Sequence, residues 1–147
     1  MTEPGLEELP LDECLQLLRD GSVGRIAFTV DDFPVVFPVN FRLVETSAAP
    51  WIALRTRPGN IIDRAPLATA FEIDGIDEGH REGWSVLVRG TLEHVDPDAA
   101  GFRERFDPEP WLVTERESWL AIAPFAITGR RLHPTEQVWA FQVSAHL

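Results

Sequence analysis

The chain has 147 residues, of which 44% are hydrophobic and 25% charged, and its formal net charge is −11. This length and composition predict one globular domain spanning residues 1–147. The acidic charge argues against sequence-independent binding of nucleic acid and disfavours anionic membrane surfaces, because both need a basic surface on the protein. Cys14 is the only cysteine, which excludes an intrachain disulfide and a multi-cysteine zinc site.

Short apolar runs dominate the chain and predict strands, whereas helical periodicity is confined to brief segments. Pro34 and Pro38 favour a sheet edge or bulge, because proline cannot donate a hydrogen bond to the ladder. In the first half of the chain, the predicted elements are a helix at Leu11–Arg19, strands at Val23–Val30, Pro34–Leu43 and Trp51–Thr56, and a helix at Asn60–Ala65. Two strands follow at Leu67–Ile73 and Trp84–Val95, separated by a polar loop at Asp74–Gly83. The last predicted elements are a helix at Asp96–Phe106 and strands at Trp119–Pro124, Ala126–Leu132 and Glu136–Val143.

The predicted strands number six or seven and are not separated by regular helices, which argues against a doubly wound parallel sheet. We therefore expect a mainly β fold, an antiparallel barrel with small peripheral helices. The acidic start shows no signal-peptide pattern, and the longest apolar run, Trp119–Ile127, is interrupted by Pro124 and too short for a bilayer. These features predict a cytoplasmic protein.

One segment combines several groups that bind anions. The strand ending in Arg55 and Thr56 is followed by a turn at Pro58-Gly59 and by a helix start that Asn60 can cap. The free backbone N–H groups and the dipole of a helix N-terminus favour a phosphate. An ordinary strand–turn–helix has the same pattern, so two interpretations are open from the spacing alone.

The other groups of polar and aromatic residues point to no specific binding or catalytic site. The segment Glu72–Glu82 suits a hard cation in the type of its side chains, which include Glu72, Asp74, Asp77, Glu78, His80 and Glu82. Their spacing matches no calcium loop, so a solvated surface loop is the better interpretation. The four histidines show no metal-ligand spacing, and no nucleophile elbow is present. Ser85 is interpreted as a strand residue, and no metal site is predicted. The five tryptophans are explained mainly by core packing, although one or two of them could stack on a flat ring system.

The chain resembles the pyridoxamine 5′-phosphate oxidase-like family, the flavin-binding split barrels. The matching segments, whose order and spacing carry the resemblance, are Gly24-Arg25-Ile26-Ala27-Phe28, Pro38-Val39-Asn40-Phe41, Arg55-Thr56-x-x-Gly59-Asn60, Ala70-Phe71-Glu72-Ile73-Asp74, Gly83-Trp84-Ser85-Val86-Leu87-Val88-x-Gly90 and Ile127-Thr128-Gly129-Arg130-Arg131. The resemblance implies a six-stranded antiparallel split barrel that forms a homodimer and holds flavin mononucleotide (FMN) at the subunit interface.

The resemblance also implies roles for individual residues. The phosphate of FMN is expected to bind at Arg55, Thr56, Gly59, Asn60 and the adjoining Ile61. Pro38, Val39 and Asn40 are expected to run beside the ring and the ribityl chain. Ser85, with Trp84 alongside, is expected to approach across the dimer, and Trp139 to pack near the ring from the partner subunit.

Two departures from the family pattern are visible. Ile61 occupies a position where the family commonly has a basic residue, and losing a charge-assisted contact to phosphate costs roughly 1.5–3 kcal/mol, unless Arg57 or Arg64 compensates. The chain also ends without the basic segment of the true oxidases, so oxidation of pyridoxamine phosphate is not expected. The sequence thus predicts a flavin-dependent oxidoreductase of unidentified small-molecule substrate; the alternatives are a deazaflavin-dependent reductase and a non-catalytic binding or sensor module.

Overall fold

In the computed structural model, which describes residues 5–56, 64–96 and 118–134, seven strands and one helix are present. The elements are β1 (Leu6–Leu9), α1 (Leu11–Asp20), β2 (Val23–Val30), β3 (Phe33–Glu45), β4 (Pro50–Thr56), β5 (Leu67–Asp77), β6 (Glu82–His94) and β7 (Ser118–Leu132). The helices predicted at Asn60–Ala65 and Asp96–Phe106 and the strand predicted at Glu136–Val143 fall largely or wholly outside the described residues.

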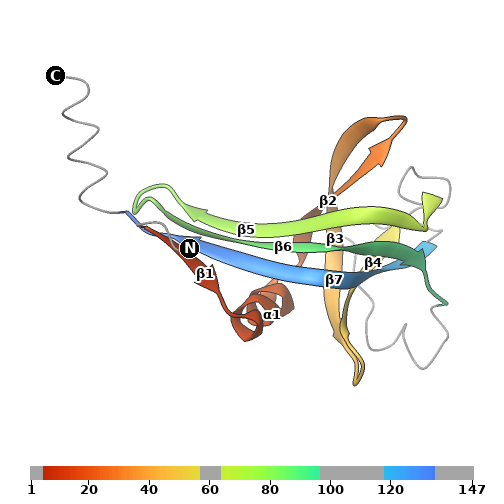
Figure 1. The fold of residues 1–147 in the computed structure, drawn as a ribbon, viewed down its shortest axis with the longest axis horizontal. Helices are drawn as coiled ribbons and strands as arrows, with labels where there is room; N and C mark the ends of the chain where they lie inside the picture. Colours follow the sequence, from red (N-terminus) through yellow and green to blue (C-terminus); the bar gives the residue numbers. More distant parts are fainter. Residues whose placement is uncertain (1–4, 57–63, 97–117, 135–147) are drawn as a thin grey trace.

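All neighbouring strands are antiparallel, and the order β7-β4-β3-β2-β5-β6 closes through a pairing of β6 with β7. The predicted six-stranded antiparallel split barrel is therefore confirmed. β5 pairs with β2 only from Ala70 to Glu72, and beyond that point β5, β6 and β7 continue side by side away from the barrel. We call this projecting part the sheet extension; β1 lies along the end of β7 there (Figure 1).

The strand registers explain where prolines are tolerated. Pro34 and Pro38 lie where β3 pairs with β2, whereas β4 pairs with β3 only from Phe41 to Glu45. Both prolines thus occupy a stretch of β3 with one neighbouring strand, as predicted. The β2–β3 turn is formed by Asp31 and Asp32, both with positive φ, which is the backbone of a tight two-residue hairpin.

Two boundary predictions were wrong. β7 is one continuous strand and does not break at Pro124, because the irregularity opposite Arg89 and Gly90 is a bulge, where proline is tolerated. The polar loop predicted at Asp74–Gly83 is mostly strand, and only residues 78–81 connect β5 to β6. Polar residues on these strands alternate with buried ones, as expected for a sheet with one solvent-facing side.

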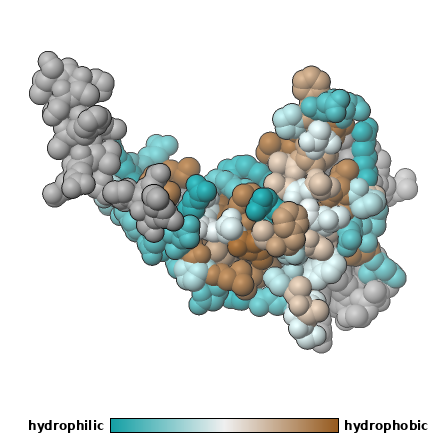
Figure 2. All heavy atoms as spheres, viewed as in Figure 1, coloured by the Kyte–Doolittle hydropathy of each residue, from teal (hydrophilic) through white to brown (hydrophobic). Residues whose placement is uncertain are grey.

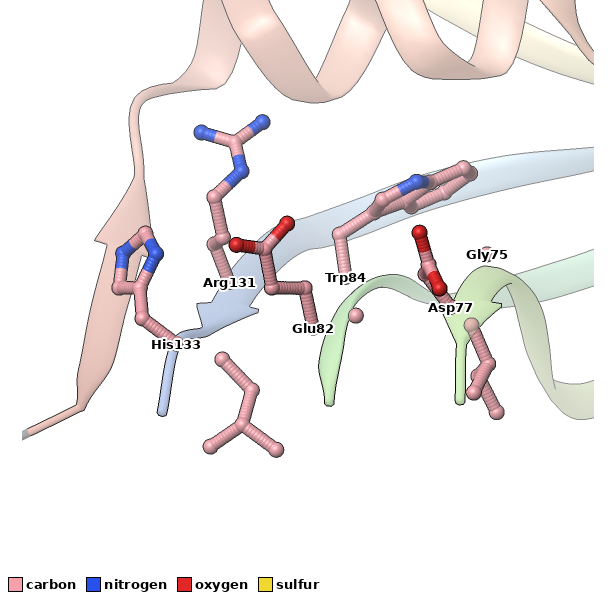
Figure 3. Close-up of a pocket in the computed structure, with 9 residues that line it drawn as sticks. Gly75, Asp77, Glu82, Trp84, Arg131 and His133 are labelled. Atoms are coloured by element: carbon pink, nitrogen blue, oxygen red, sulfur yellow. The ribbon is translucent and has the colours of Figure 1, made fainter. Parts of the chain in front are cut away.

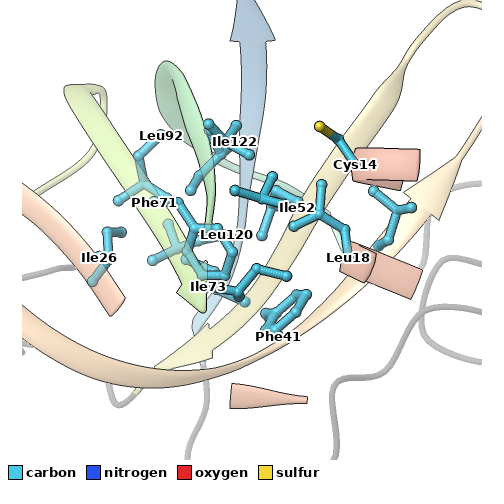
Figure 4. Packing of buried hydrophobic residues seen from close by; sticks show 14 of the residues in the cluster. Cys14, Leu18, Ile26, Phe41, Ile52, Phe71, Ile73, Leu92, Leu120 and Ile122 are labelled. Atoms are coloured by element: carbon cyan, nitrogen blue, oxygen red, sulfur yellow. The ribbon is translucent and has the colours of Figure 1, made fainter. Parts of the chain in front are cut away.

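The core fills the barrel and is completed by α1. Fully buried Phe71, Ile26, Ile52 and Leu120 converge from different strands (Figure 4). Cys14 and Leu18, one helical turn apart on α1, are also fully buried in this cluster. Burial raises the pKa of the Cys14 thiol, so this cysteine acts as a small apolar side chain.

Candidate functional site

The predicted phosphate and ring segments lie at the same end of β3 and β4. Phe41 of β3 pairs with Leu54 of β4, so the next residues outward are Asn40 on one strand and Arg55 on the other. Thr56 pairs with Ser118 at the start of β7. The backbone thus brings two separate parts of the predicted site together. The side chains of Arg55 and Thr56, together with Gly59, Asn60, Ile61 and Trp139, lie outside the description.

Strand alternation divides the predicted ring contacts between two faces. Val39 packs against the barrel core, whereas Pro38 is exposed and lies opposite the exposed Arg25 of β2. Asn40 follows on the outer face, and its amide nitrogen donates a 3.4 Å hydrogen bond to the Ser22 carbonyl oxygen. The outer face of the barrel therefore presents Pro38 and Asn40 to a ligand, while Val39 supports them from inside.

An ion-pair cluster lies next to Pro38 on this outer face. Arg25 Nη1 donates 2.9 Å hydrogen bonds to Glu72 Oε1 and to Asp74 Oδ2, linking β2 to β5. Partial burial, followed by the neighbouring Asp74 carboxylate, raises the pKa of Glu72, and Arg25 opposes part of that rise. This cluster was not predicted as part of the site. The alternation of Glu72 and Asp74 with buried Phe71 and Ile73 was the signal that could have placed it on a strand.

Ser85 and Trp84 point to opposite sides of the sheet. Ser85 pairs with Asp74 of β5 and Arg130 of β7, so it shares the outer face with the ion-pair cluster. Trp84 packs against the core and lies over Gly75, where a Cβ would be 2.5 Å from its indole Nε1. A ligand on the outer face can therefore contact Ser85 without contacting Trp84.

Pro38 and Ser85 do not meet within one chain. Pro38 pairs with Arg25, Arg25 with Glu72, and Glu72 with Leu87, so three strand spacings separate β3 from β6. At about 4.8 Å each, these spacings amount to roughly 14 Å. Both residues nevertheless face outward.

Small and apolar residues form a second row across the outer face, next to the row that contains Pro38, Arg25 and Glu72. Val36, Ala27 and Ala70 stand in register on β3, β2 and β5, and Arg89 follows on β6. Val36 is 61% exposed and Leu87 38% exposed. Arg89 holds its guanidinium carbon 5.6 Å from the ring centroid of Phe125, which is 75% exposed at the β7 bulge. The outer side of a barrel is ordinarily polar, so this apolar row marks a candidate contact surface.

No group of three or more histidine, cysteine, aspartate or glutamate side chains in the described ranges could hold a metal ion. The acidic side chains of β5 and β6 instead take part in ion pairs or face solvent: Glu72 and Asp74 bind Arg25, and Asp77 binds His80. None of the helices among the described residues is long and apolar enough to cross a membrane.

Comparison with known proteins identifies the family. The model of the family described as pyridoxamine 5′-phosphate oxidase matches residues 10–131. The chain belongs to this family. It is 31% identical over 134 residues to the uncharacterised protein Rv0080 of Mycobacterium tuberculosis, covering 85% of this chain and 84% of that protein.

Solved structures share the fold. A protein of Mycobacterium smegmatis, described as FAD binding, superposes with a TM-score of 0.73 at 33% identity, over 88% of this chain and all of the other. A protein of unknown function from Corynebacterium diphtheriae superposes with a TM-score of 0.73 at 28% identity, over 87% of this chain and 98% of the other.

Proposed function

We propose that this member of the pyridoxamine 5′-phosphate oxidase family binds a flavin nucleotide and acts as an oxidoreductase on a small molecule. The observation that carries the proposal is the register that places Pro38–Asn40 beside the end of β4, where the predicted phosphate segment begins. The structural relative described as FAD binding supports it. FMN is the proposed form of the cofactor, with FAD and a deazaflavin as its competitors.

The described residues fit a flavin in their chemistry. A flavin ring needs a flat apolar surface together with a few hydrogen-bonding groups at its edge. Pro38 supplies apolar surface, Asn40 supplies an amide that is hydrogen-bonded to the Ser22 carbonyl oxygen, and Ser85 supplies a hydroxyl on the same outer face. The bound flavin supplies the hydride chemistry; the residues of this chain bind and orient the ring and exclude water from it.

We further propose that two copies of the chain assemble the site. Ser85 lies too far from Pro38 to contact the same ring edge within one chain, whereas a second copy packed on the outer face can bring its own Ser85 close. Ala27 and Ala70, which are paired at the middle of the apolar row, allow close approach of two sheets. The face also carries the basic side chains of Arg25, Arg89 and Arg130 as well as Glu72 and Asp74, so it has both signs of charge, whereas chains of net charge −11 are otherwise expected to repel each other.

The identity of the cofactor is tested by absorption. Purified protein is titrated in parallel with FMN, FAD and a deazaflavin cofactor, and the visible absorption of the bound cofactor is followed. We expect saturable binding of FMN with one flavin per chain. Tighter binding of FAD or of the deazaflavin would show that this molecule, and not FMN, is the cofactor. If none of the three binds, the proposed function is overturned.

The phosphate segment is tested by Arg55→Ala. Removing one charge-assisted contact to a phosphate is expected to weaken FMN binding about ten- to hundredfold, with little change in stability. Arg42→Ala is the matched control, because Arg42 is an exposed arginine of the neighbouring strand β3. Equal affinities of the two variants would show that Arg55 does not hold the phosphate.

A non-catalytic binding module is the second candidate, and Ile61 favours it, since an isoleucine cannot pair with a phosphate. The two functions are separated by adding a nicotinamide reductant to the flavin-loaded protein in the absence of oxygen. We expect loss of the visible flavin band as the flavin is reduced. Tight flavin binding without reduction by any nicotinamide donor would favour the binding module.

A further inference from the structure

A pocket of about 320 Å³ opens at the far end of the sheet extension, on the side opposite Ser85. Its walls come from the end of β5, the start of β6 and the end of β7, and they include Asp77, Glu82, Trp84, Arg131 and His133 (Figure 3). These residues lie on the inner face of the sheet, where the apolar core gives way to charged side chains. In the space-filling view this projecting end is mainly hydrophilic (Figure 2).

The pocket is separate from the predicted phosphate segment of the same chain. Arg131 and Ser118 lie near opposite ends of β7, and Ser118 pairs with Thr56. Thirteen residues of extended strand span roughly 40 Å. A phosphate group at Arg55 and Thr56 therefore cannot also occupy the pocket of the same chain.

The Trp84 ring lies directly against the backbone of Gly75, and both residues line the pocket. Indole atoms Nε1, Cε2 and Cζ2 lie so close to Gly75 that a Cβ there would be 2.5, 2.7 and 2.9 Å from them. Only glycine leaves room for this contact. The carboxyl groups of Glu82 and Asp77 flank the ring (Figure 3).

The charges around the pocket favour a cation. Its two basic side chains are already engaged: Arg131 Nη2 donates a 2.6 Å hydrogen bond to Glu13 Oε1 of α1, and His133 Nε2 lies 3.0 Å from Glu7 Oε2 of β1. Asp77 bonds to His80 in the turn. In the part of the chain that the structure describes, no hydrogen bond or ion pair engages the Glu82 carboxylate.

We propose that this pocket binds an organic ammonium ion, with the cation near Glu82 and its alkyl groups against the Trp84 ring. An aromatic ring attracts such cations through its negative face, and a nearby carboxylate adds a direct charge interaction. An anionic ligand would meet the carboxylates of Asp77 and Glu82. The chain's own segment 135–147 contains no lysine or arginine and so lacks the group that the pocket recognises.

The test uses choline as the probe and 3,3-dimethylbutan-1-ol, its uncharged isostere, as the comparison ligand. Both are titrated into the full chain by calorimetry and by NMR, with the Trp84 indole N–H signal assigned from the Trp84→Phe variant. We expect choline to bind at least about tenfold more tightly than the isostere, in line with a cation held by a ring and a carboxylate. We also expect it to shift the Trp84 signal.

Two substitutions test whether the Glu82 carboxylate is the group that binds the cation. Glu82→Gln is expected to weaken choline binding about two- to fivefold, as the loss of an exposed ion pair does, whereas Glu78→Gln, in the turn beside the pocket and outside its lining, is expected to leave it unchanged. Equal binding of choline and its isostere, no shift of the Trp84 signal, or no effect of Glu82→Gln would each overturn the proposal. So would FMN shifting the same signal and displacing choline. Flavin binding elsewhere without choline binding would overturn this inference alone.

Discussion

At the scale of single residues, close contacts set the distance between β2 and β5 beneath the outer face. Gly24 lies against the fully buried Phe71 ring, and an added Cβ would be 2.6 Å from its Cε2 and 3.0 Å from the Glu72 carbonyl oxygen. The ring cannot easily retreat, because it packs edge-on against Phe41 with centroids 4.8 Å apart. This contact keeps Arg25 and Glu72 in register.

Gly24→Ala is expected to lower the free energy of unfolding by about 1–3 kcal/mol through overpacking. Gly79→Ala is the control, since the nearest atom to its added Cβ is Asp77 Oδ1 at 3.5 Å. Urea denaturation measures both variants. Equal stability of the two would mean that Phe71 can move aside.

Glu72 predicts a pH dependence of stability. Its pKa is raised above 4.5 in the folded chain by burial and by Asp74, so the folded state holds the proton more firmly than the unfolded state. The stabilisation that protonated Glu72 gives to the folded state is fully present below the ordinary pKa of a glutamate, and it is lost as the pH rises through the raised pKa. Glutamine carries no proton to lose, so the free energy of unfolding of Glu72→Gln should rise relative to that of the original chain as the pH increases from the ordinary pKa to the raised pKa.

Urea denaturation at a series of pH values measures this difference. Glu78→Gln controls for the loss of one negative charge on the same hairpin. A difference between Glu72→Gln and the original chain that stays constant with pH would contradict the assigned shift.

At the scale of elements, α1 closes the barrel by packing one side of the helix against the core. Leu18 is fully buried in the core and Leu11 is 56% exposed on the same helix. Leu18→Ala is expected to cost about 2–5 kcal/mol of stability, as buried leucines do, while Leu11→Ala stays within about 0.5 kcal/mol. Chemical denaturation compares them, and similar losses would show that α1 does not complete the core.

The elements also show what the sequence could predict. Strands with strong alternation, such as Val23–Val30, were located correctly, because one buried face imposes a period of two. β1 was missed, since four residues joined to the end of β7 carry too short a pattern. The continuity of β7 depends on a bulge opposite Gly90, and pairing between distant strands is not visible in local sequence.

The candidate site was predictable only in part, for the same reason. Arg55 was predicted from the local residue pattern and Pro38 and Asn40 through the resemblance, and the register of β3 with β4 brings their strands together. The Arg25–Glu72–Asp74 cluster joins residues 47 and 49 positions apart in the chain. Only the pairing of β2 with β5 reveals it.

At the scale of the whole molecule, self-association through the outer face is expected to decide its mass in solution. Ala27 and Ala70 are paired at the centre of that face, so Ala70→Arg should place a bulky charge between two packed copies. We expect this variant to be a monomer by analytical ultracentrifugation. Leu11→Arg, which adds the same charge on α1, should remain a dimer; the opposite pattern would place the interface elsewhere.

The most direct test of a flavin site assembled by two copies is sedimentation velocity of the protein mixed with FMN, detected at the visible absorption band of the flavin. This measurement reports the mass of the species that carries the cofactor. We expect the visible absorbance to sediment with a two-chain species that holds one flavin per chain. Visible absorbance that sediments with a single chain, or that does not sediment with the protein at all, would contradict the account.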